Sequence, residues 1–175
     1  MKFLRTFLFV MCLLLLISAA GCVSPVVVAP ENRDAEIDTI LAAAESLFQA
    51  MEQCDYEGIW NHLTEKSKQQ IISDVYKACR KRGDTVTPES LDRDFEAGGP
   101  AAKSYWDAFL FHFDPDTVLS RSTWSMGDVS ARKAEIQILY EKSEHPAVVK
   151  MFKENGAWKV GLEETFRLRR YLPTW

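Results

Sequence analysis

The hydrophobic pattern of this chain changes its period near Asp114-Pro115-Asp116, and this change constrains the fold more than any other feature. Before it, apolar residues recur every three to four positions, as they do on one face of a helix. After it, apolar and polar residues alternate, which is typical of strands with one buried face. Helices followed by consecutive strands indicate an α+β domain whose antiparallel sheet has one face covered by helices.

The first two thirds of the chain predict a series of helices. A long helix over residues 34–53 places its apolar side chains on one face. Residues 54–58 break this helix, and a short helical turn around Trp60 follows. Thr64 predicts the N-cap of another helix, and Gly83 ends it because glycine readily adopts the left-handed conformation.

Four basic residues close the helix that begins after Thr64: Lys77, Arg80, Lys81 and Arg82. Positive charge at this position compensates the negative end of the helix dipole. We prefer this interpretation to the alternative, a binding patch.

Two shorter helices follow in the sequence. Thr87-Pro88-Glu89 combines a cap, a first-turn proline and an early acid, and Pro100 begins the second helix. The second helix carries an aromatic face: Tyr105, Trp106, Phe109 and Phe113. Such a stripe predicts either core packing or the wall of a pocket.

Roughly four strands are expected after this helical part. The pattern predicts strands over residues 118–126, 134–141 and 148–153, with a turn at Gly127-Asp128. Asn155-Gly156 is a strong hairpin signal. The fourth strand is expected to hold Trp158, Val160 and Leu162.

The first 21 residues have the order of a secretory signal. Lys2 and Arg5 precede an apolar run over residues 7–20, which ends in small residues. The run is shorter than the ~20 apolar residues that cross a bilayer. We therefore expect a segment that is removed rather than a membrane-spanning helix.

Ala19-Ala20-Gly21-Cys22 resembles the lipobox of bacterial lipoproteins, although that family usually has Leu where this chain has Ala19. The resemblance implies that Cys22 is acylated, becomes the first mature residue and binds membrane lipid. Val23, in place of the Asp that marks inner-membrane retention, implies the outer membrane of the cell envelope, facing the periplasm. The alternative is ordinary signal cleavage after Ala20.

These signals divide the chain into a signal peptide (1–21), a tether (22–33) and a single α+β domain (34–170). Loss of Lys2 and Arg5 with the signal leaves 19 basic against 25 acidic residues, a net charge of −6. This balance argues against nucleic acid as a partner. Cys12 leaves with the signal and Cys22 is acylated, so Cys54 and Cys79 remain, either as a disulfide or as free thiols.

Two further segments resemble the nuclear transport factor 2-like superfamily, especially its small bacterial lipoproteins. Residues 55–60 lead into Leu63-Thr64 after a long first helix, and residues 152–160 form a late hairpin. The resemblance implies a curved sheet wrapped around a long helix as a cone. In some members the cone is an enzyme pocket, and in others it is a binding or dimerisation module. The helical insert over residues 88–113 implies a variant of this cone.

Candidate site residues follow from that expectation. A pocket in the cone would be lined by aromatic residues: Trp60, Tyr105, Trp106, Phe109 and Tyr140. His62, Asp107 and His112 are the candidates for acid–base catalysis. Asp114 and Asp116 alternate with His112, but Asp114 before Pro115 is also an ordinary turn residue, so we predict neither a metal nor a cofactor.

Two functions are compatible with the sequence. The first is a non-enzymatic lipoprotein that binds a small apolar ligand or an envelope protein. The alternative is a hydrolase or isomerase that uses a His/Asp pair in the cone pocket. No glycine-rich phosphate loop and no Gly-x-Ser-x-Gly motif occurs in the sequence to favour a particular reaction.

Overall fold

The structure, a computed structural model, describes residues 30–166, with side chains from residue 33 onward. The expected signal peptide, Cys22 and most of the tether lie outside these residues. Helix α2 (Pro30–Glu52) begins four residues before the expected start at Asp34. The residues from Arg33 to the end of the described chain belong to one compact unit. Among the described helices, none combines the length and the apolar character needed to cross a membrane.

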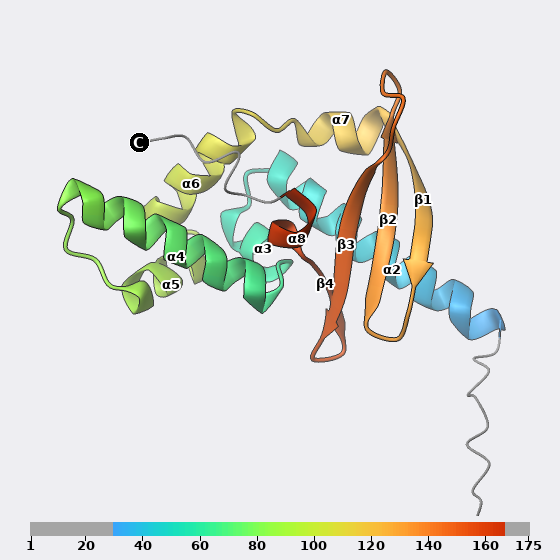
Figure 1. Cartoon of the computed structure of the whole chain (residues 1–175), viewed down its shortest axis with the longest axis horizontal. Coiled ribbons are helices and arrows are strands. Elements are labelled where there is room, and N and C mark those ends of the chain that lie inside the picture. Colours follow the sequence, from blue (N-terminus) through green and yellow to red (C-terminus); the bar gives the residue numbers. More distant parts are fainter. Residues whose placement is uncertain (1–29, 167–175) are drawn as a thin grey trace, which may run out of the picture. The chain divides into compact units, whose positions relative to one another are not determined.

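Helix α2 lies along one face of the sheet (Figure 1). Its buried residues recur at helical spacing: Ile40, Ala44, Leu47, Phe48 and Met51. In its second turn, Glu36 accepts hydrogen bonds from Lys153 Nζ and Trp158 Nε1, both at 2.7 Å. Towards its other end, the ring of Phe48 meets Trp124 edge-on at 5.7 Å. The helix therefore spans the sheet from its last strand to its first.

The capping residues confirm the predicted series of helices. Asp55 accepts a hydrogen bond from Gly58 N and begins α3 (Tyr56–Asn61). Thr64 begins α4 (Glu65–Arg82), which ends at left-handed Gly83 with φ 88°. A capping box formed by Thr87 and Ser90 begins α5 (Pro88–Glu96), and Gly99 precedes α6 (Pro100–Leu110). Helix α5 packs against α3, α4 and α6, so the insert joins the helical part of the domain.

Four antiparallel strands follow in the order β1-β2-β3-β4. They are β1 (Ser122–Val129), β2 (Lys133–Tyr140), β3 (Ala147–Glu154) and β4 (Ala157–Val160). The hairpin between β3 and β4 turns at Asn155-Gly156, where both residues have positive φ. The predicted α+β class, with helices followed by a four-stranded antiparallel sheet, is confirmed.

The start of the first strand was predicted too early. Pro115–Ser120 forms helix α7, because Asp114 caps it by accepting hydrogen bonds from Asp116 N and Thr117 Oγ1. The expected turn at Gly127-Asp128 is instead an irregularity within β1, where the register with β2 shifts between Met126 and Val129. A Cβ at Gly127 would lie 3.2 Å from Glu135 Cβ, which explains the glycine at this bulge.

Leu162 was predicted to lie in the fourth strand but begins helix α8 (Leu162–Phe166). This short helix returns the chain to α4 and β3. Lys150 N donates to Thr165 Oγ1 at 3.0 Å, and Lys66 forms an ion pair with Glu164. The buried side chain of Leu162 therefore contributes to the core from a helix rather than from the sheet.

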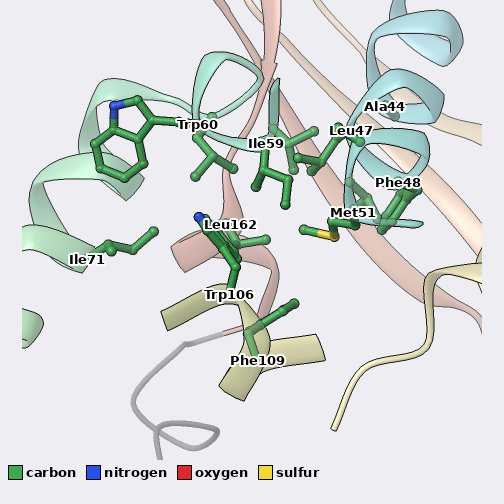
Figure 2. Close-up of a cluster of buried hydrophobic side chains, with 14 of the residues drawn as sticks. Ala44, Leu47, Phe48, Met51, Ile59, Trp60, Ile71, Trp106, Phe109 and Leu162 are labelled. Carbon is green, nitrogen blue, oxygen red and sulfur yellow. The ribbon is translucent and has the colours of Figure 1, made fainter. Parts of the chain in front are cut away.

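A continuous chain of aromatic contacts connects the helical part to the sheet. Ring contacts of 4.8–6.0 Å join the members in the order Trp60, Phe95, Tyr105, Trp106, Phe109, Phe113, Phe48 and Trp124. Figure 2 shows Trp106 and Phe109 directed towards the side chains of α2 and α3. Aromatic burial of this extent dominates the energy of a core, so helices and sheet are held as one packed unit.

Candidate functional site

The residues expected to line a pocket are mostly packed into the core. Trp60, Tyr105, Trp106 and Phe109 are all buried, and Trp106 has no exposed surface. Their rings contact one another or Phe95. Tyr140 is separate and half-buried on the sheet, with the Arg121 guanidinium 5.4 Å from its ring centre. These contacts make the aromatic stripe of α6 core packing, the first of the two predicted alternatives.

His62 lies at the end of α3 and is half-buried. Burial lowers the pKa of its imidazole, the positive charge of Lys159 lowers it further, and Asp55 opposes this shift. Among the described residues, no hydrogen bond joins the His62 side chain to a carboxylate. Within residues 30–166, His62 is therefore not part of a hydrogen-bonded His/Asp pair.

Asp107 belongs to an exposed network with Tyr56 and Lys103. Tyr56 Oη donates to Asp107 Oδ1 at 2.6 Å, and Lys103 Nζ lies 3.0 Å from Asp107 Oδ2 and 3.1 Å from Tyr56 Oη. The hydrogen bond from Tyr56, and then that from Lys103, lower the pKa of Asp107. The same bond to Asp107 raises the pKa of Tyr56. Because its pKa is lowered, Asp107 is a weaker proton acceptor than an ordinary carboxylate.

His112 and its acidic neighbours take part in local structure. His112 is exposed, and its ring meets that of Phe111 at 4.9 Å. Asp114 caps α7, and Asp116 Oδ1 accepts a hydrogen bond from Ser120. In the part of the chain that the structure describes, no three His, Cys, Asp or Glu side chains are grouped to hold a metal ion.

Both cysteines of the described domain are free thiols, which resolves the predicted alternative against the disulfide in this structure. Cys54 is exposed, with φ 54°, in the turn between α2 and α3. Cys79 is buried on α4, and its sulfur lies 3.5 Å from Arg82 Nη2.

A buried polar cluster, which the sequence did not predict, lies where α4, α6 and α8 meet. Burial, together with the charges of Asp74 and Glu163, raises the pKa of Tyr105. Glu163 N donates to Ser67 Oγ at 3.3 Å, while Glu163 Oε2 and Trp106 Nε1 have no hydrogen-bond partner among the described residues. Residues far apart in sequence build this cluster, so no local pattern could reveal it.

The two edges of the sheet differ in what covers them. Along β4, Thr64 N donates to Val160 O at 3.0 Å and Val160 N donates to His62 O at 2.9 Å, so the loop between α3 and α4 covers this edge at Val160. Strand β1 forms the opposite edge. Figure 1 shows β1 at the outer side of the sheet, with β2 as its neighbouring strand.

The backbone groups that β1 leaves open follow from its pairing with β2. Glu141 N donates to Arg121 O, so Arg121 and the alternate residues Thr123 and Ser125 exchange hydrogen bonds with the neighbouring strand. The N–H and C=O groups of Ser122, Trp124 and Met126 consequently point away from the sheet. Within residues 30–166 these groups have no hydrogen-bond partner.

Over residues 122–126, the open edge lacks the charged residues and prolines that commonly prevent edge pairing. The bulge begins only at Gly127-Asp128. Trp124 and Met126 are only partly buried against the core. We therefore regard β1, over residues 122–126, as the candidate interaction surface.

Comparison with known proteins did not identify a relative. The chain matches no family model, no curated protein and no solved structure.

Proposed function

We propose that this protein is a lipid-anchored, non-enzymatic interaction module of the bacterial envelope, which binds a protein through the open edge of β1. The observation that carries the proposal is the row of backbone groups at Ser122, Trp124 and Met126, which have no hydrogen-bond partner within residues 30–166. An edge of this kind binds extended protein segments by adding a strand to the sheet.

The packing of aromatic side chains in the core favours a protein partner over a small apolar ligand. The aromatic residues that would line a ligand cavity pack against each other instead. Catalysis is also less well supported, because His62 has no hydrogen-bonded carboxylate in the described part and Asp107 is exposed and bound to Tyr56 and Lys103.

We further infer that the domain is a variant of the nuclear transport factor 2-like cone. The long helix α2, packed between Trp158 at one end and Trp124 at the other, supports this inference. The insert formed by α5 and α6 accounts for the departure from a compact cone.

The anchor is the acylated Cys22, at the outer membrane and facing the periplasm. The apolar run that ends in Ala19-Ala20-Gly21-Cys22 supports it. Two or three acyl chains hold a protein stably at a bilayer, whereas one does so only marginally. Intact-mass measurement of the mature chain tests the anchor. We expect an acylated chain that begins at Cys22, and a chain beginning at Gly21 with a free thiol would contradict it.

Site-specific photo-crosslinking in living cells tests the interaction. A photoreactive amino acid replaces Ser125 on the open edge, and in a matched variant it replaces Asp92, which is exposed on α5. We expect a defined protein adduct, identified by mass spectrometry, from position 125 and not from position 92. Cys22→Ser should reduce the adduct, because the chain is no longer concentrated at the membrane surface. Equal adducts at both positions, or none at either, would contradict the proposal.

A further inference from the structure

The open edge of β1 is complementary to itself. We propose that its partner is a second copy of this chain, with the two β1 strands paired antiparallel about a two-fold axis at Trp124. This inference rests on the proposed function, because it names the partner for the same edge. Closed two-fold symmetry is the commonest arrangement of homo-oligomers.

The register follows from the limits of the open stretch. Arg121 ends the stretch on one side, directly after α7, and the bulge at Gly127-Asp128 ends it on the other. Full overlap of residues 122–126 with the same residues of a second copy places Trp124 opposite the second copy's Trp124. Ser122 then lies opposite the second copy's Met126. All three residues direct N–H and C=O outward, so each pair can exchange both hydrogen bonds.

The side chains fit this register on both faces. Trp124 and Met126 lie on the core face of the sheet and are only partly buried in one copy. Pairing two copies brings the tryptophans together across the axis, and aromatic cross-strand pairs stabilise antiparallel sheets. On the outer face, exposed Thr123 lies directly opposite the second copy's Ser125, so two small neutral side chains meet.

The charges at the two ends of residues 122–126 are also compatible with this register. In this register Arg121, which pairs with Glu141 of its own chain, lies at the same end of the paired strands as the second copy's Asp128. Opposite charges therefore approach each other at both ends of the paired strands, and no like charges face each other over residues 122–126. This pattern favours the second copy over a partner strand of arbitrary sequence.

Disulfide crosslinking of the full chain in cells tests the register. In a Cys54→Ser background, one differently tagged chain carries Thr123→Cys and the other carries Ser125→Cys. Directly opposed residues of a non-hydrogen-bonded pair have Cβ atoms ~4.5–5.5 Å apart, close enough for a bridge after small adjustment. We expect a disulfide-linked species with both tags on co-expression. Either variant expressed alone should form little of the disulfide-linked dimer. In this register residue 123 of one copy is only a diagonal neighbour of residue 123 of the other, and the same holds for residue 125.

A charge reversal provides the matched control. The double variant Thr123→Lys with Ser125→Lys places like charges opposite each other, whereas Thr123→Lys with Ser125→Glu places opposite charges there. Sedimentation of the mature lipidated chain in density-matched detergent measures the dimer. The two lysines should raise its dissociation constant about tenfold or more relative to the unsubstituted chain. The second pair should retain the dimer.

Failure of this inference differs from failure of the proposed function. Either of two results would overturn self-pairing. One is a crosslink that forms no better on co-expression than with a single variant, and the other is equal dimerisation of the two charge variants. If position 125 nevertheless captures a different envelope protein, the edge is an interaction site and only the identity of its partner changes. The proposal that the partner is a second copy is supported if the dimer dissociates in the Lys/Lys variant and the crosslink forms between the two cysteine variants.

Discussion

At the scale of single residues, burial separates aromatic side chains that look alike in the sequence. Trp106 and Phe111 lie five positions apart at the end of α6, yet Trp106 is fully buried and Phe111 is 84% exposed. Trp106 contacts the rings of Tyr105 and Phe109, whereas Phe111 contacts only the ring of His112 among the described aromatic pairs. The energetic importance of the two residues must therefore differ.

Trp106→Ala should lower the free energy of unfolding by about 3–5 kcal/mol, because it removes a large buried side chain and leaves a cavity. Phe111→Ala should change it by less than about 0.5 kcal/mol, since the ring is already in water. Urea unfolding followed by circular dichroism measures both. Similar losses for the two variants would show that α6 is packed differently from the arrangement in Figure 2.

At the scale of elements, Ser67 joins the start of α4 to the start of α8. Its buried hydroxyl lies 2.8 Å from Thr64 Oγ1 and accepts a hydrogen bond from Glu163 N. Thr64 Oγ1 also accepts a hydrogen bond from Ser67 N as the N-cap of α4. One small polar pair therefore caps one helix and positions another that is 96 residues away in the sequence.

Ser67→Ala should destabilise the protein by about 1–2 kcal/mol, because Glu163 N loses its partner in a buried place. Hydrogen exchange should also become faster at the Glu163 amide. Ser73→Ala on the same helix is the matched control, since Ser73 forms no side-chain hydrogen bond within the described residues. An unchanged exchange rate at Glu163 in Ser67→Ala would contradict the proposed role of this hydroxyl.

At the scale of the whole molecule, the ionisable groups make the folded state more stable at neutral pH than at acid pH. The pKa values of Glu36, Asp107 and Asp114 are all lowered, in each case chiefly by side-chain hydrogen bonds. Folding therefore favours their ionised forms, and this stability is lost as pH falls through the lowered pKa values. The lowered pKa of His62 acts in the same direction at higher pH, because burial disfavours its protonated form.

The melting temperature should therefore begin to fall below about pH 6.5, the ordinary pKa of histidine, before the carboxylates contribute. In this range the unfolded chain binds a proton at His62 that the folded chain does not. His62→Gln should flatten the dependence between about pH 7 and 5. The same exchange at His112, which is exposed, is the matched control. If the melting temperature of His62→Gln still falls over this pH range, another group causes the dependence.

The sequence predicted most of the elements because their signals are local. Thr64, Thr87 and Gly83 act within a few residues of themselves, and each performs its predicted role. The errors arose where a local signal was ambiguous. Asp114-Pro115 starts a helix as well as it makes a turn, and Gly127-Asp128 fits a bulge as well as a hairpin. In both places the choice depends on contacts with distant residues.

Periodicity and capping depend on neighbouring residues, so they were enough to predict the α+β class, the order of helices before strands and the helix caps at Thr64, Gly83 and Thr87. Three features depend instead on contacts between distant segments of residues 30–166: the burial of the aromatic stripe around Trp106, the hydrogen bond of Asp107 to Tyr56 rather than to a histidine, and the open edge of β1. Burial and edge exposure depend on which segments meet in space. Long-range packing fixes those contacts, and no local pattern encodes them.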